Sequence, residues 1–236
     1  MKIAIHQPQY FPYAGFFHKL SLVDTFVIMD DVQYDKRFTN RNKIIAPNGW
    51  IWITVPINKD HKFRPNSEVE INNDMPWKEL HWKNIHHVYA NAKFFHLYED
   101  YFRTIYQKEW KMLFDLDLET IKQTIKFLGL KTKIIKGSEI KVEGESTQRL
   151  VNICKSVGAD TYVSGAGGKN YMDVKLFEKN NIRLEYQNYR CRTYKQHLAQ
   201  SFVPDLSIID TLANNGPDTL QLIKNQDEFA VTAQII

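Results

Sequence analysis

The residues best suited to chemistry begin directly after the first apolar stretch of the chain. His6 and Gln7 follow that stretch, and Pro8 and Pro12 stiffen the loop after them. Because imidazoles exchange protons near neutral pH, we predict that His6 is catalytic, unless it only hydrogen-bonds its own loop. His18, in the same segment, is a second candidate catalytic residue, unless it lies at the surface. The segment also supplies four predicted substrate-binding residues, which are Gln7, Tyr10, Gly15 and Lys19.

A pair of carboxylates, Asp30 and Asp31, follows the second apolar stretch. Two buried carboxylates repel each other, which raises the pKa of one of them, as a general base requires. We therefore predict a catalytic role for both; the alternative is a turn with an aspartate cap and a surface salt bridge. Amide and guanidinium groups shortly after them suit phosphate or carboxylate, and this predicts further substrate binding by Gln33, Asn40, Arg41 and Asn42.

A glycine-rich loop at residues 164–171, with the sequence SGAGGKNY, joins a short predicted strand to a helix. Its glycines allow backbone N–H groups to approach an anion closely. The spacing matches neither a Walker loop nor the Gly-x-Gly-x-x-Gly fingerprint, so an ordinary tight connection is the alternative. Substrate contacts are predicted for Ser164, Gly165, Gly168 and Tyr171.

Several common chemistries are not supported by the motifs. There is no Gly-x-Ser-x-Gly elbow, and Cys154 and Cys191 do not form a Cys-x-x-Cys pair. The histidines of the predicted 76–88 helix lack the i, i+4 spacing of a zinc protease. We predict no metal site, and the sequence leaves the cofactor undefined.

Alternating apolar strands and helices must position these residues. Strands are predicted at residues 2–6, 25–30, 50–57, 132–135, 161–163 and 182–186. Helices are predicted at residues 14–22, 76–88, 92–114, 118–128, from 146 or 147 to 157, and 172–179. This order predicts an α/β fold, a mostly parallel Rossmann-like sheet flanked by helices, within one domain over residues 1–236 that carries a helical insertion at about 76–128.

Composition narrows the choice of partner and compartment. Lys and Arg number 31 against 27 Asp and Glu, and the basic residues form no stripe, so we expect no nucleic-acid partner. The N-terminus lacks a signal peptide and no stretch is long and apolar enough to cross a bilayer, which favours a soluble cytoplasmic protein. The oligomeric state is not indicated.

Larger segments of the chain resemble the WbqC-like protein family. These are HQPQYFPYAGFFHKL, DTFVIMDDVQYDKRFTNRNKI, WITVPI, RLVNIC and GADTYVSGAGGKNYMD, and the step from Tyr194 to Gln196 before FVPDLSIIDTLANNG. The family often has a His-Pro pair shortly before that step, where this chain has Cys191-Arg192-Thr193. The resemblance implies a role in bacterial O-antigen and related surface-polysaccharide biosynthesis, acting on a modified sugar, and substrate contacts from Tyr194 and Gln196.

Together these observations favour group transfer to a nucleotide-linked amino sugar. His6 or Asp30 would deprotonate the attacking amine, while Lys19, Arg41 and the amides of residues 164–168 would hold phosphates. A variant is acyl activation by ATP, although Tyr13 and Phe16 occupy the two histidine positions of a His-x-Gly-His motif. The expected partner is thus a small molecule, either a nucleotide sugar or an activated acyl donor. The alternative is a non-catalytic protein that binds nucleotide sugars in the same pathway.

Overall fold

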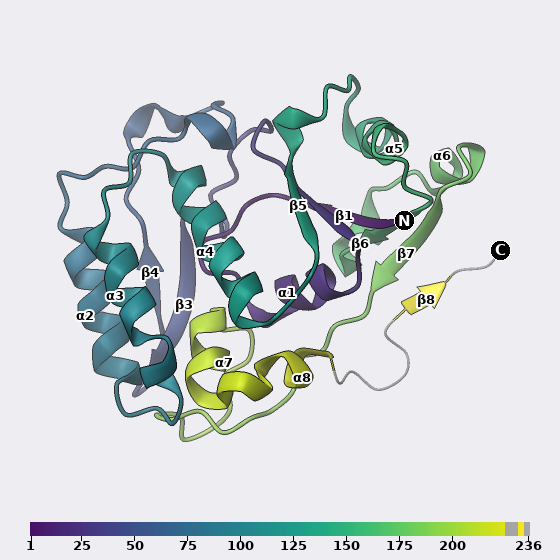
Figure 1. The fold of residues 1–236 in the computed structure, drawn as a ribbon. Coiled ribbons are helices and arrows are strands. Elements are labelled where there is room, and N and C mark those ends of the chain that lie inside the picture. The colour runs from purple at the N-terminus through teal and green to yellow at the C-terminus, as the bar shows by residue number, and fades with distance from the viewer. Residues whose placement is uncertain (225–230, 234–236) are drawn as a thin grey trace.

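The computed structural model describes residues 1–224 and 231–233, and a six-stranded sheet lies at its centre (Figure 1). The strand order is β5-β2-β1-β6-β7-β8, with bounds Lys133–Lys136, Thr25–Ile28, Lys2–His6, Thr161–Ser164, Arg183–Gln187 and Val231–Ala233. The first five strands are parallel, and β8 pairs antiparallel with β7. With helices packed on this sheet, the predicted α/β class is confirmed.

The chain winds outward from the central strand β1 in both directions. It passes from β1 through α1 (Ala14–Ser21) to β2 and later reaches β5 at the edge. It then returns to the other side of β1, through α5 (Ser146–Ser156) to β6 and through α6 (Val174–Lys179) to β7. The winding therefore reverses between β1 and β6. In doubly wound sheets, ligands bind outside the carboxyl ends of the strands at such a point.

Side chains of β1 alternate between two apolar layers. Ile3 and Ile5 pack in the layer that includes buried residues of α5 and α6, whereas Ala4 packs in the layer that includes α1. Since successive side chains of a strand face opposite sides, His6 lies on the same side as Ala4. Its ring indeed contacts the edge of Phe16 in α1, with ring centroids 5.2 Å apart.

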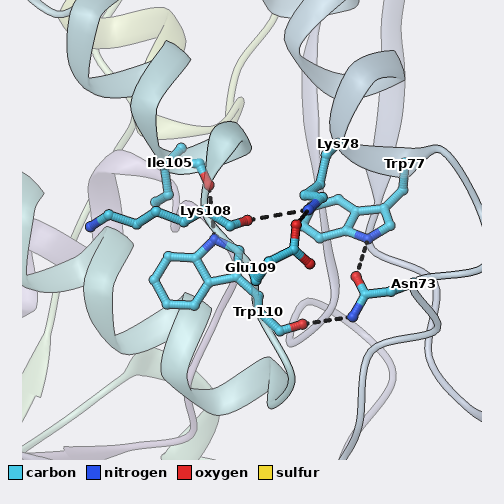
Figure 2. Close-up of polar contacts among 7 residues, drawn as sticks. All are labelled: Asn73, Trp77, Lys78, Ile105, Lys108, Glu109 and Trp110. Carbon is cyan, nitrogen blue, oxygen red and sulfur yellow. Dashed lines mark hydrogen bonds and ion pairs between the residues drawn. The ribbon is translucent and has the colours of Figure 1, made fainter.

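The predicted helical segment contains α2 (Trp77–Tyr89), α3 (Glu99–Gln107) and α4 (Leu113–Phe127). The prediction of helix throughout 92–114 is wrong, because α3 ends at Gln107 and residues 108–112 form a turn. Polar contacts hold this turn beside α2 (Figure 2). Asn73 Nδ2 donates to the Trp110 carbonyl at 2.8 Å, and Asn73 Oδ1 accepts from Trp77 Nε1 at 3.2 Å. Trp110 Nε1 donates in turn to the Ile105 carbonyl at 2.8 Å.

A separate antiparallel hairpin consists of β3 (Arg41–Ala46) and β4 (Gly49–Thr54). Only β4 falls within a predicted strand, and it belongs to this hairpin rather than to the main sheet. Trp50 and Trp52 are partly exposed on β4, with the Lys43 ammonium 5.3 Å and the Arg41 guanidinium 4.5 Å from their ring centroids. No strand was predicted at β3 because it contains charged residues. In the structure these residues are accommodated by cation–π contacts with β4.

Two further helices, α7 (Ile208–Asn215) and α8 (Thr219–Lys224), follow the main parallel strands. Helices α4 and α5 end at Phe127 and Ser156, close to the predicted ends at 128 and 157. Just beyond them, Gly129 and Gly158 have φ values of +63° and +70°, a conformation that favours glycine after a helix. Glu145 occupies the N-cap of α5, and Thr147 Oγ1 accepts from the Asp173 amide. Among the described residues, no helix combines the length and apolar character needed to cross a bilayer.

Candidate active site

Two cavities lie at the carboxyl end of β1, where the winding of the sheet reverses. The larger has a volume of about 580 Å³ and the smaller about 280 Å³. The larger is bounded by Arg149 and Leu150 of α5, and the smaller by Gly15 and Lys19 of α1. His6 lines both cavities.

The larger cavity combines aromatic rings with unmet hydrogen-bond acceptors. Tyr162 and Tyr171 line it, the latter 67% exposed, together with the loops after β1 and β2. Gln7 and Gln9 also line it, and the Oε1 atom of each is shielded from solvent without a partner in the described structure. Because buried acceptors are normally satisfied, these two oxygens suit a ligand that brings hydroxyl or amino donors.

Arg149 brings a guanidinium to the larger cavity, and Asp31 holds it there. Asp31 Oδ2 forms an ion pair with Arg149 Nη2, while Arg149 Nε is buried and has no partner within the described residues. The charge of Arg149 is thus already balanced, and a hydrogen-bond donor is left for a ligand. Asp31 itself does not line either cavity, so its place in the structure is that of a positioning residue for Arg149.

Asp30 has a different environment from its neighbour. It is buried, and both of its carboxylate oxygens accept from Ser138, from the amide at 2.8 Å and from the hydroxyl at 2.6 Å. These bonds fix the turn that follows β5. The two aspartates therefore do not share a site, and Asp30 does not line the two cavities.

His6 is held in one tautomer by its own loop. Its Nδ1 lies 2.9 Å from the Gln7 carbonyl, which can only accept, so Nδ1 carries the hydrogen and Nε2 keeps a lone pair. Removal from bulk water lowers the pKa of His6 to about 3, and the positive charge of Lys19 acts in the same direction. His6 is consequently neutral at pH 7, as a proton acceptor must be.

Lys19 is a buried cation on the wall of the smaller cavity. Its side chain is 3% exposed, and burial lowers its pKa to about 7. Within the described part of the chain, no carboxylate pairs with its ammonium group, which lies 5.7 Å from the Phe26 ring centroid. A buried charge without a partner is costly, so this lysine suits an anionic ligand.

His18 lies behind the smaller cavity rather than on its wall. Gln187 Nε2 donates to His18 Nδ1 at 2.9 Å and to the Gly15 carbonyl at 2.7 Å, which fixes the first turn of α1. Burial lowers the pKa of His18 to about 4, so the ring is neutral. His18 is 1% exposed and accepts a hydrogen bond from Gln187, which lines the cavity. His18 therefore holds Gln187 in position.

Of the residues predicted to bind substrate, the cavities bring together Gln7, Gly15, Lys19, Gly165 and Tyr171. Others anchor the loops that shape the cavities. Asn42 Nδ2 donates to the carbonyls of Tyr10 and Phe11, at 3.2 and 2.7 Å, which holds the loop after β1 against the hairpin. The Tyr10 ring is fully buried and contacts Tyr106 through its hydroxyl, at 2.5 Å.

The remaining predicted residues after β2 and β6 lie outside the two cavities. Asn40 Nδ2 donates to the Val55 carbonyl at 2.9 Å, and Arg41 Nε donates to the Arg37 carbonyl at 3.1 Å. Gln33 is exposed. Ser164 is buried and packs against Gly168, where a Cβ atom would lie only 2.2 Å from the serine hydroxyl.

Tyr194 and Gln196 converge on a buried carboxylate, Asp210, in α7. The Tyr194 hydroxyl and Gln196 Nε2 donate to Asp210 Oδ2 at 2.6 and 3.0 Å, and the Tyr89 hydroxyl donates to Oδ1 at 3.1 Å. Desolvation raises the pKa of Asp210. The network anchors the segment after β7, whose residue Tyr189 lines the smaller cavity.

Sequence reasoning missed several cavity residues: Gln9, Tyr13, Arg149, Gln187 and Tyr189. Two signals were available. Gln187 and Tyr189 follow a predicted strand, so the rule that pointed to His6 and Gly165 applies to them equally. Arg149 begins the segment RLVNIC in a predicted helix, although only the structure shows that it lies beside Asp31.

Metal binding has no obvious place in this arrangement. Among the residues that the structure describes, no three His, Cys, Asp or Glu side chains gather into a group that could hold a metal ion. The polar groups at the cavities are instead amides, hydroxyls, an imidazole, two guanidinium groups, an ammonium group and the single carboxylate of Asp35, which together suit organic ligands.

Comparisons with known proteins bear on the whole chain. The WbqC-like protein family matches residues 7–222. An uncharacterized protein of Mycobacterium tuberculosis, Rv1507c, is 34% identical over 226 residues, which cover 93% of this chain and 97% of that protein. No solved structure gives a significant match. On the extent of these matches, the chain belongs to the WbqC-like protein family.

Proposed function

We propose that this chain is a transferase that modifies a nucleotide-linked amino sugar in the biosynthesis of a bacterial surface polysaccharide. The substrate class comes from the family resemblance. The observation that carries the chemistry is the position of His6, on the walls of two cavities of different character. A proton acceptor between two compartments suits the transfer of a group from a donor in one to an acceptor in the other.

The larger cavity is the better fit for the amino sugar. Its volume of about 580 Å³ lies within the range of small-molecule sites. The free amide oxygens of Gln7 and Gln9 can accept from hydroxyl and amino groups, and Arg149 Nε can donate to a ring or carbonyl oxygen. Tyr162 and Tyr171 offer aromatic surface of the kind against which sugar rings pack.

In the proposed step, the sugar amine attacks the electrophilic carbon of an activated acyl donor. A bond forms between the amine nitrogen and that carbon, and the leaving group departs with the electron pair of the bond that breaks. The proton of the amine passes to the lone pair on His6 Nε2, because Nδ1 already donates to Gln7. The proton then passes from His6 to the leaving group, which restores the neutral imidazole.

Replacement of His6 tests this proposal. The wild-type protein is incubated with nucleotide-linked amino sugars and acyl thioesters, and product is followed by mass spectrometry. We expect His6→Ala to lose roughly 10²- to 10⁴-fold in rate while sugar binding changes little, because it removes the proton acceptor alone. His87→Ala, at an exposed histidine of α2, is the matched control and should keep full activity. Equal turnover by His6→Ala and the wild type would exclude His6 as the base.

A non-catalytic sugar-binding role is the second candidate, and the pKa of His6 favours it. A pKa of about 3 makes the imidazole a weak base in the empty site. The same assays separate the two roles. Tight binding of nucleotide sugars, with no product from any class of activated donor, would support a binding protein and contradict a transferase.

A further inference from the structure

The smaller cavity has the character of an anion site. Lys19 lines it, almost fully buried, and no ion pair or hydrogen bond of its ammonium group is found among the described residues. A hydrogen-bonded or charged partner is the rule for such a group, so its absence inside a cavity points to a partner supplied by a ligand. An anionic ligand would supply that partner.

Three residues of the glycine-rich loop form part of the wall of the smaller cavity. Gly165, Ala166 and Gly167 line the cavity, and a Cβ atom added at Gly165 would lie 3.9 Å from Lys19 Nζ. The loop therefore passes within van der Waals distance of the ammonium group. No hydrogen bond of the Ala166 or Gly167 amide is found within the described residues, so both N–H groups remain available as donors.

No side-chain carboxylate lines the smaller cavity among the described residues. The titratable groups that face it are His6, Lys19, Tyr13 and Tyr189, and all can be neutral or donate a hydrogen bond. His18 lies behind Gln187, while Cys191 and Asp205 lie near the two tyrosines without lining the cavity. Lys19 and the backbone of the glycine-rich loop therefore offer donors with no opposing carboxylate on the wall, which suits an oxyanion with several oxygens.

We propose that the smaller cavity binds a phosphoryl group, held by the ammonium group of Lys19 and the backbone amides of residues 166 and 167. The site would exist equally in a binding protein, so it does not depend on group transfer. It has one consequence for His6. Since the Lys19 charge opposes protonation of His6, an anion beside Lys19 offsets that charge and makes the imidazole a stronger base.

Calorimetric titration with inorganic phosphate, pyrophosphate and acetate tests the proposal, at constant ionic strength and pH 8. We expect phosphate or pyrophosphate to bind the wild type and to bind Lys19→Met at least about tenfold more weakly, because a charge-assisted hydrogen bond is lost. Lys19→Met should fold, because it removes an unpaired buried charge. Lys169→Met removes an exposed lysine of the same loop and should bind as the wild type does. Preference for pyrophosphate over phosphate indicates a phosphoryl group attached to a larger ligand.

Two readouts separate this site from adventitious binding at the surface. Lys19 is largely neutral at pH 8, so binding should take up a proton in the wild type and not in Lys19→Met, as measured in buffers of different ionisation enthalpy. In NMR titrations, phosphate should raise the pKa of His6 in the wild type only. Equal affinities for the wild type and Lys19→Met, stronger binding of acetate than of phosphate, or no binding of any probe at millimolar concentration would each overturn the proposal.

Discussion

At the scale of single residues, neighbours in sequence have separate tasks around the site. His6 lines the cavities, while the carbonyl of Gln7 fixes its tautomer and the Gln7 side chain keeps a buried oxygen without a partner among the described residues. Asp30 holds a turn, and Asp31 holds an arginine. Each polar group is therefore explained by what it contacts rather than by its residue type.

Gly15 offers a sharp test of how tightly the smaller cavity is built. A Cβ atom there would lie 2.4 Å from the Tyr13 ring and 2.7 Å from the Tyr189 ring. We expect Gly15→Ala to destabilise the protein by about 1–3 kcal/mol through overpacking, which outweighs the gain of about 1 kcal/mol in helix propensity. Urea denaturation measures the change.

Gly167→Ala is the matched control, because nothing lies within 4 Å of a Cβ atom at that position. Its free energy of unfolding should stay within about 0.5 kcal/mol of the wild type. Equal effects of the two substitutions would contradict the close packing of Tyr13 and Tyr189 around α1.

Residue types at strand ends predicted part of the site. His6, Lys19 and Gly165 were found because strand ends of parallel sheets meet at one edge, and the structure brings all three to the smaller cavity. The burial of His18 and the engagement of Asp30 by Ser138 could not be predicted, because both depend on contacts between segments far apart in sequence.

At the scale of elements, the hairpin and the helical segment hold the site from outside the sheet. Asn42 in β3 binds the backbone of the loop after β1, so the hairpin fixes the residues that follow His6. Local patterns predicted β4 but not β3, whose lysine and arginine reach over tryptophans of the partner strand. A single strand read alone does not reveal such cross-strand contacts.

The turn between α3 and α4 gives a prediction at this scale (Figure 2). Asn73 bridges Trp77 and Trp110, whereas Lys78 donates to the Lys108 carbonyl and pairs with Glu109, which is 82% exposed. We expect Asn73→Ala to cost about 1 kcal/mol in unfolding free energy, because two directed hydrogen bonds are lost.

Lys78→Met should cost less, about 0.5 kcal/mol or below, because exposed ion pairs contribute little. Thermal and urea unfolding of both variants provide the comparison. A larger loss in Lys78→Met than in Asn73→Ala would mean that charge rather than the asparagine bridge holds the turn.

At the scale of the whole molecule, three desolvated imidazoles make the free energy of unfolding fall as the pH is lowered. The pKa of His6 is lowered to about 3, and those of His18 and His81 to about 4, chiefly by desolvation. Each binds a proton in the unfolded chain at a higher pH than in the folded chain. Their contribution to stability is thus complete above about pH 6.5 and is lost as the pH falls toward their folded pKa values, about 4 for His18 and His81 and about 3 for His6.

His81→Gln isolates one of these contributions. Near pH 5, the fall of unfolding free energy should be less steep than in the wild type by up to about 1.4 kcal/mol per pH unit. Asp117 and Asp210, whose pKa values are raised by burial, act in the opposite direction, so the difference between variants is the quantity to measure. His87→Gln, at an exposed position, should leave the slope unchanged. Identical slopes for His81→Gln and the wild type would contradict a neutral buried His81.

The fold class could be predicted because the alternation of apolar strands and helices is recognisable even where the ends of single elements are predicted wrongly. Strand order was not, because nothing in a local pattern says that β5 returns beside β2 or that β6 lies beside β1. We infer a single domain from the apolar layer shared by α1, α4 and α7, which joins the helical segment to the sheet.

The central place of β1 determines when this site can form during synthesis. β1 is synthesised long before β6, yet the two strands pair, and Lys2 lies beside Thr161. The nascent chain must therefore keep an apolar strand unpaired on one side until the chain has been synthesised through β6. Such distant pairing slows folding, and it leaves β1 open to chaperones before His6 meets the glycine-rich loop.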